Sequence, residues 1–167
     1  LYLDTDTIVS GNLSNLFSLL DFKKKNKLNK KLYTIFANEE ASPPERSFHG
    51  QQIYKLHKKD YLKMKKFSTG VLLFKNCYSV ENIFLRSQSF SRKFIQQYER
   101  SFGDNVLEFS RCDQPTINFL LNEQSLVDVK SLSKFVKNNP KQNQQFLISH
   151  FPGGVGNENK VSKILNK

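Results

Sequence analysis

The chain has 167 residues, of which 38% are hydrophobic and 13% aromatic, so it fits one domain with a real core and is not disordered as a whole. Its only two cysteines, Cys77 and Cys112, are too few for a disulfide framework and are expected to be free thiols. The net charge of +11 suggests an anionic partner, and no apolar run approaches the ~18 residues that span a membrane.

The chain opens on the apolar run Leu1-Tyr2-Leu3 rather than on Met, whereas native termini are usually polar and frayed. We therefore expect the natural protein to extend upstream. Any targeting signal or membrane anchor would then lie in that front part. The compartment therefore stays open: the cytoplasm, or the Golgi lumen if the front part carries an anchor.

Short runs of strand-forming residues, bounded by polar or Pro- and Gly-containing segments, predict strands. They cover, in chain order, residues 1–3, 32–36, 67–74, 127–129 and 146–148. Thr7-Ile8-Val9 either continues the first strand or begins a turn. Phe67–Phe74 is the clearest strand, because a nearly continuous apolar run suits a strand that is covered on both faces.

Helical spacing of apolar residues predicts helices over residues 15–20, 76–98 and 113–121. The candidate core positions of the second helix are Val80, Phe84, Phe94 and Ile95. The third begins with Asp113 as a cap and Pro115 in its first turn. Strands that alternate with helices predict an α/β domain, in which ligands collect at the carboxyl ends of strands.

Most of the excess positive charge lies between Lys23 and Lys66, since residues 21–66 hold 13 Lys and Arg against five Asp and Glu. A nucleic-acid-binding segment would interleave aromatic residues for base stacking, and Lys23–Lys31 has none. We therefore expect no nucleic-acid partner. The segment is interpreted as a solvated loop, or as a contact to a membrane surface or an anionic acceptor.

Asp4-Thr5-Asp6 places two carboxylates two residues apart at a strand end. Two interpretations stay open: a shared divalent cation, or an Asp-capped turn. His150 also ends a predicted strand, and glycines follow it. Glycine lets backbone N–H groups approach phosphate closely, and Lys160 would add a cation; the alternative is a flexible turn beside a structural histidine.

Two further features admit both a functional and a structural interpretation. Thr69-Gly70 interrupts the apolar strand, which marks either the close approach of a ligand or core packing with a bulge. Asp113-Gln114 presents two polar side chains at a helix start, either toward a ligand or, for Asp113, as a simple N-cap.

Four motifs, taken in this order, resemble those of glycosyltransferase family 8 or a close relative with the GT-A fold. Leu1–Val9 (LYLDTDTIV) resembles the D-x-D strand of the family, and Phe67–Phe74 (FSTGVLLF) its F-N-T-G-V strand. Cys112–Asn118 (CDQPTIN) resembles its D-Q-x-x-hydrophobic-N segment, and Ile148–Gly154 (ISHFPGG) its I-x-H-F-x-G segment.

The resemblance implies a GT-A-like α/β fold, with a mixed sheet flanked by helices. It implies that residues 1–167 form a single partial domain that lacks its front and carries a Lys-rich variable insertion at about residues 22–66. The implied activity is metal-dependent transfer of a hexose from a UDP-sugar to a protein, lipid or glycan acceptor, with retention of anomeric configuration. A basic binding or scaffold module and an inactive relative are the alternatives.

The resemblance also implies roles for individual residues. Asp4, Asp6 and His150 match the metal ligands, for Mn²⁺ or alternatively Mg²⁺. Asp113 matches a residue that binds donor hydroxyls, and Gln114 the glutamine near the anomeric centre. The implied donor contacts are Asp4, Thr5, Asp6, Ser68, Thr69, Gly70, Gly153, Gly154 and Lys160. The sequence departs from the family at Ser68, where Asn is usual, and at Lys160, which follows the histidine later than usual.

Overall fold

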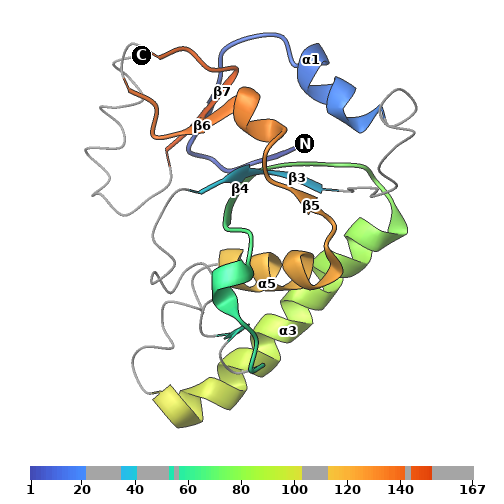
Figure 1. The fold of residues 1–167 in the computed structure, drawn as a ribbon, viewed down its shortest axis with the longest axis vertical. Coiled ribbons are helices and arrows are strands. Elements are labelled where there is room, and N and C mark those ends of the chain that lie inside the picture. Colours follow the sequence, from blue (N-terminus) through green and yellow to red (C-terminus); the bar gives the residue numbers. More distant parts are fainter. Residues whose placement is uncertain (22–34, 41–52, 55–56, 103–112, 142–143, 152–167) are drawn as a thin grey trace.

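The computed structural model describes residues 1–21, 35–40, 53–54, 57–102, 113–141 and 144–151 (Figure 1). Several predicted features lie outside this part of the chain. They are the proposed phosphate contacts Gly153, Gly154 and Lys160, together with Cys112 and much of the Lys23–Lys66 segment.

The described strands form two sheets. The first has the order β1-β4-β3-β5 and consists of β1 (Tyr2–Leu3), β4 (Phe67–Phe74), β3 (Ile35–Glu39) and β5 (Val127–Asp128). The second has the order β2-β7-β6 and consists of β2 (Thr7–Val9), β7 (Ile148–His150) and β6 (Val136–Asn138). Each sheet contains parallel and antiparallel pairs, so the predicted α/β class with mixed sheets is confirmed.

Helices cover the first sheet from one side. They are α3 (Tyr78–Phe102) and α5 (Gln114–Gln124), and Figure 1 shows both below the strands. The second sheet and α1 (Ser14–Phe17) lie above them in the same view. Three short 3₁₀ turns complete the described elements: η1 (Ser18–Leu20), η4 (Tyr61–Lys63) and η6 (Leu132–Lys134).

The first sheet is buried on both faces, as the apolar run in β4 predicts. Leu72 of β4 packs with Ile35, Ala37 and residues of α3 and α5 in one core. Its neighbours Val71 and Leu73 pack with Phe36, Leu132 and Ile148 in another. This period-2 alternation follows from the strand geometry, and burial of each such side chain contributes about 1.5–3 kcal/mol.

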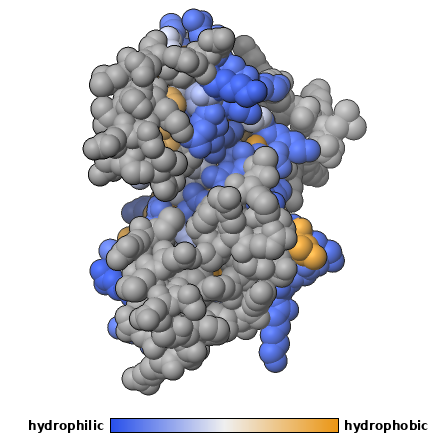
Figure 2. Space-filling model, turned by 90° about the vertical axis from the view of Figure 1, so that its left-hand side faces the viewer, coloured by the Kyte–Doolittle hydropathy of each residue, from blue (hydrophilic) through white to orange (hydrophobic). Residues whose placement is uncertain are grey.

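The second core forms the contact between the two sheets. Phe36 and Leu73 come from the first sheet, and Val136 and Ile148 come from the second. On the surface view of Figure 2, the described residues are mainly hydrophilic, with apolar residues visible in only small areas. Among the described residues, no helix is both long enough and apolar enough to cross a bilayer.

Three strand predictions need correction. β3 runs on to Glu39, past the predicted end of this strand at residue 36, because Asn38 and Glu39 pair with Ser68 and Phe67 across an irregularity in the register. Thr7–Val9 is neither an extension of β1 nor a turn but a strand of the other sheet. β7 lies two residues later than predicted, since it pairs from Ile148 to His150 with β2.

The helix predictions hold in place, with adjusted ends: the second and third helices extend to Phe102 and Gln124, and the first is α1 followed by η1. In α3, Val80 is buried and Phe84 packs against the first core, as predicted, and Ile83 is buried as well. The side chains of Phe94 and Ile95 lie outside the described set.

A ladder of side-chain amides fastens α5 to β4 and the residues before it. Three amide side chains lie four residues apart along the helix. Each forms hydrogen bonds to the backbone of one residue in the strand segment, and those three residues lie two apart. The pairs are Gln114 with Thr69, Asn118 with Phe67, and Asn122 with Lys65. The spacing works because four helical residues rise about 6.0 Å and two strand residues about 6.6 Å.

Asp128, at the end of β5, fixes the turn that leads into η6. Its Oδ1 accepts hydrogen bonds from the backbone N–H groups of Lys130 (2.8 Å) and Ser131 (3.0 Å), and its Oδ2 accepts one from the Ser131 hydroxyl (2.8 Å). Partial burial pushes the pKa of Asp128 upward. The hydrogen bonds from Ser131 and Lys130, with the charge of Lys65, outweigh burial and hold that pKa below its ordinary value.

We expect Asp128→Ala to lower the free energy of unfolding by about 1 kcal/mol at neutral pH, as the loss of a helix cap does. Because the folded-state pKa is lowered, the carboxylate stabilises the fold above its unfolded-state pKa of about 3.9, and this contribution disappears as pH falls through the folded-state value. Urea unfolding at pH 7 and near pH 3 measures the difference in the free energy of unfolding between the wild type and Asp128→Ala. This difference should be smaller at the lower pH. Asp21→Ala, at an exposed position, is the control. An equal difference at both pH values would contradict the idea that the ionised carboxylate of Asp128 stabilises the fold.

Candidate metal centre

The candidate site lies where the chain crosses from the first sheet to the second. The Asp4 N–H donates to the Gly70 carbonyl (2.8 Å), which extends the pairing of β1 with β4. The Phe151 N–H donates to the Asp6 carbonyl (3.0 Å), which extends the pairing of β2 with β7. Between them the Thr7 hydroxyl donates to the Asp4 carbonyl (2.8 Å) and closes the turn. Each aspartate is therefore anchored to a different sheet.

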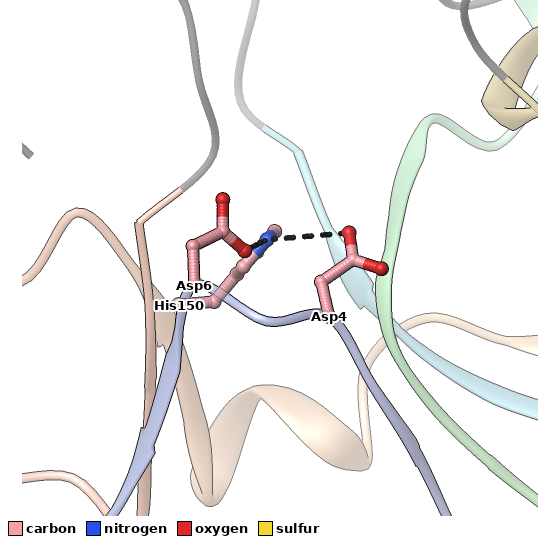
Figure 3. Close-up of side chains that lie close together, drawn as sticks. All are labelled: Asp4, Asp6 and His150. Carbon is pink, nitrogen blue, oxygen red and sulfur yellow. Dashed lines mark ion pairs between the residues drawn. The ribbon is translucent and has the colours of Figure 1, made fainter. Parts of the chain in front are cut away.

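Both aspartates and His150 converge at this crossing. One ligand atom from each of Asp4, Asp6 and His150 can be chosen so that all three lie within 4.8 Å of one another. The His150 Nε2 lies 3.3 Å from Asp6 Oδ1 and 4.0 Å from Asp4 Oδ2, and Figure 3 shows the imidazole reaching both carboxylates. The structure thus brings together three residues that the sequence analysis selects from two separate motifs.

The three side chains differ in exposure in a way that suits a cation site. His150 is 2% exposed. The Asp6 side chain is 16% exposed, and the Asp4 side chain is 41% exposed. The imidazole is thus held by the surrounding protein, while Asp4 opens the cluster to solvent. An imidazole with two carboxylates is a donor set that Mn²⁺ accepts well.

Gly70 makes room for the cluster. A Cβ atom at this position would lie 2.2 Å from both Cε1 and Nε2 of His150, and 3.0 Å from Asp4 Oδ2. The bulge interpretation of Thr69-Gly70 agrees with the irregular pairing of β3 with β4, and the group that lies close to the Gly70 backbone is the His150 imidazole. Real Cβ atoms do not approach other atoms at 2.2 Å, so a larger residue would displace His150.

The other edge of the imidazole contacts two polar side chains. The Nδ1 of His150 lies 3.0 Å from Asn138 Oδ1 and 3.4 Å from Ser68 Oγ. Ser68 also accepts a hydrogen bond from the Gly70 N–H (3.3 Å), so its hydroxyl belongs to the support of the site. Sequence reasoning missed Asn138, and nothing local to Val136-Lys137-Asn138 marks it as part of a site.

Tyr2 is a second residue that the sequence analysis did not select. Its hydroxyl donates to Asp4 Oδ1 (2.6 Å), and this bond, with burial and the negative charges nearby, raises the pKa of Tyr2 to about 12. The phenol therefore stays protonated near neutral pH. It engages one carboxylate oxygen of Asp4, and the other oxygen, Oδ2, is the one nearer to His150.

Asp113 and Gln114 lie next to the cluster, at the start of α5. The Thr69 hydroxyl donates to Asp113 Oδ1 (3.3 Å), and the Thr69 N–H donates to Gln114 Oε1 (3.2 Å). Asp113 occupies the N-cap position but makes no side-chain cap, so the simple capping interpretation is wrong. The reason is geometric: the helix start faces β4, and the carboxylate pairs there.

Electrostatics connect Asp113 with the metal ligands. Protein atoms that crowd its carboxylate raise the pKa of Asp113; the Thr69 hydrogen bond opposes this shift, and the negative charge of Asp4 adds to it. Asp4 also raises the pKa of Tyr2, as do Asp113 and Asp6. The three aspartates therefore form one region of negative charge, which a cation would stabilise.

The remaining predicted donor contacts divide by position. Thr69 and Ser68 are buried beside Gly70, whereas Thr5 is exposed at the turn between the two aspartates. Gly153, Gly154 and Lys160 are outside the described residues.

No protein-family model matches the chain, and neither does any curated protein or solved structure. A functional assignment therefore rests on the motifs and on this geometry.

Proposed function

We propose that the protein is a metal-dependent glycosyltransferase of the GT-A type, which moves a hexose from a UDP-sugar to an acceptor with retention of anomeric configuration. The observation that carries the proposal is the meeting of Asp4, Asp6 and His150 within 4.8 Å. These residues come from opposite ends of the described sequence. Two motifs that resemble those of the family thus meet in space.

The residues fit a divalent cation by their chemistry and by the space around them. Carboxylate oxygens suit Mg²⁺ and Mn²⁺, and the imidazole of His150 favours Mn²⁺. The lack of a side chain at Gly70 leaves a cradle against His150 and Asp4, which a Cβ atom would fill. When bound, the cation would neutralise the charge that develops on the departing diphosphate.

In this proposal, the start of α5 holds the donor sugar. Asp113 uses one carboxylate oxygen for the Thr69 hydroxyl, and its other oxygen accepts from a sugar hydroxyl. Gln114 already uses Oε1 for the Thr69 backbone, so its amide nitrogen is the group it offers near the anomeric centre. Gln114 then positions the sugar and does not act as a base.

The proposed reaction breaks the bond between the anomeric carbon and the diphosphate oxygen, and the electron pair leaves with UDP. The acceptor hydroxyl oxygen forms a bond to the same face of that carbon, and its proton passes to the departing diphosphate. We assign no protein nucleophile. Partners are the UDP-sugar and an acceptor that is a protein, a lipid or a glycan.

Calorimetric titration of the protein with UDP, in Mn²⁺ and then in EDTA, tests the proposal. We expect binding that requires Mn²⁺ and is lost in Asp4→Ala/Asp6→Ala, because both carboxylates are removed. Asp21→Ala/Asp60→Ala is the matched control, since it removes equal charge at exposed positions. Failure of the folded protein to bind UDP in any condition would refute the transferase and leave a scaffold or basic binding module.

A further inference from the structure

β6 places a carboxamide against the candidate metal ligand His150. In the parallel pairing of β6 with β7, Asn138 is the register partner of His150, so both side chains project from the same face of the sheet. The register is secured beyond the strands, because the Asn139 N–H donates to the His150 carbonyl (2.8 Å). The Asn138 Oδ1 then lies 3.0 Å from His150 Nδ1.

The two ring nitrogens of His150 face different surroundings. Nδ1 faces Asn138 and Ser68, and Nε2 faces the carboxylates of Asp4 and Asp6. Both the carboxamide oxygen and the carboxylate oxygens can only accept a hydrogen bond, and the 3.0 Å contact of Nδ1 with Asn138 is shorter than the 3.3 Å and 4.0 Å contacts of Nε2, so it favours the proton on Nδ1. The Ser68 hydroxyl, at the longer distance of 3.4 Å, can donate or accept and so does not select a tautomer.

We propose that Asn138 is a positioning residue that holds His150 in the Nδ1–H tautomer and orients its ring. In this tautomer Nε2 carries the lone pair, and it offers that lone pair to the cation shared with Asp4 and Asp6. The inference rests on the proposed metal-dependent function for its purpose. Its structural half, the tautomer, concerns the metal-free protein alone.

The metal affinity of three variants tests the inference through the acceptor atom. Asn138→Leu keeps a similar volume without an acceptor, and we expect its Mn²⁺ affinity to fall about 10-fold or more, the usual effect of losing such a partner. Asn138→Asp keeps an oxygen acceptor and should retain most of the affinity. Lys137→Ala is the control on the same strand, because its exposed side chain projects from the other face of the sheet.

Nitrogen NMR of the imidazole rings provides a readout that a purely structural role would not move. The chain has three histidines, and a His150→Gln variant identifies the signals of His150. Spectra of the metal-free protein, recorded well above the usual histidine pKa of about 6.5, should show the proton on Nδ1. Asn138→Leu should shift the tautomer ratio toward Nε2–H, and Asn138→Asp should not.

The outcomes separate the two proposals. A metal-free His150 with its proton on Nε2 would overturn the inference, whatever the protein binds. Tight Mn²⁺ binding that is equal in the wild type and in folded Asn138→Leu would also overturn it, and would leave the metal site standing. Absence of Mn²⁺ binding in the wild type would overturn the proposed function and the metal half of this inference. If Asn138→Leu fails to fold, the wild-type tautomer and the affinity of Asn138→Asp still decide.

Discussion

Gly70→Ala is expected to weaken Mn²⁺ binding and to destabilise the fold. The new Cβ atom would lie 2.2 Å from two atoms of the His150 ring, which is 2% exposed and has little room to move. Overpacking of this kind costs about 1–3 kcal/mol. Because the displaced ring is also the candidate ligand, we expect Mn²⁺ affinity to fall by about 10-fold or more.

Gly11→Ala is the matched control for this substitution. Its Cβ atom would meet only the side-chain end of Leu147, at 3.2 Å, which can yield by a small rotation. Manganese titration and urea unfolding of both variants should therefore separate them clearly. Wild-type affinity in Gly70→Ala would mean that the His150 ring is not the ligand, or that it does not lie against this backbone.

Asn118→Ala is the second substitution with a large expected effect. Asn118 is fully buried, and its Nδ2 donates to the carbonyls of Phe67 (2.9 Å) and Gln114 (3.0 Å) while its Oδ1 accepts from the Phe67 N–H (3.2 Å). Removal of the amide leaves these three buried backbone groups without the hydrogen bonds that it supplies. Each such group costs about 1–3 kcal/mol, so we expect a loss of about 3 kcal/mol in the free energy of unfolding.

The neighbouring rung of the same ladder supplies the comparison. Asn122 makes equivalent bonds to the Lys65 backbone, but it is only partly buried, so water can replace the missing amide. Asn122→Ala should therefore cost about 1 kcal/mol. Urea midpoints measure both losses. Equal losses in the two variants would show that burial does not control the strength of this ladder.

Asn118→Ala should also act on the site in a selective way. Gln114 and Asp113 are positioned by α5, whereas the ligand set of Asp4, Asp6 and His150 is not. We expect UDP-sugar binding to weaken more than Mn²⁺ binding under conditions where the variant is folded. The relative size of the two effects thus tests whether α5 holds the donor.

The parts of the fold that the sequence predicts well are those whose pattern is local. Phe67–Phe74 is a nearly continuous apolar run because β4 is covered on both faces, and its predicted bounds match the structure. Helix α5 is marked by Pro115 and by apolar spacing. In each case the residues that define the element are also the residues that bury it, so the signal is contained in the segment itself.

Elements that depend on distant partners were missed or misplaced. β6 contains one buried apolar residue, Val136, and it is a strand because it pairs with β7. β3 continues through the polar residues Asn38 and Glu39 because β4 supplies hydrogen bonds there. The same limit explains Asn138: its role depends on the register with His150, and a single sequence does not display that register.

The candidate site divides in the same way. Asp4, Asp6 and His150 could be selected because their motifs resemble known ones, and the structure brings them together. Two of their supports could not, since a single sequence does not display the side-chain contacts of Tyr2 with Asp4 and of Asn138 with His150. Ser68 is predicted as a donor contact, and in the structure its hydroxyl lies 3.4 Å from His150 Nδ1. The position of Asp113 before a helix favours an N-cap, but its carboxylate accepts a hydrogen bond from the Thr69 hydroxyl in the structure.

The meeting of Asp4 with His150 has a consequence for how the protein matures during translation. A ribosome that adds roughly 5–20 residues per second would release His150 on the order of ten seconds after Asp4. Until β7 has emerged and paired with β2, the two aspartates have no imidazole beside them. The complete set of Asp4, Asp6 and His150 therefore forms only once the last described strand is in place, so the assembled set cannot guide the early steps of folding.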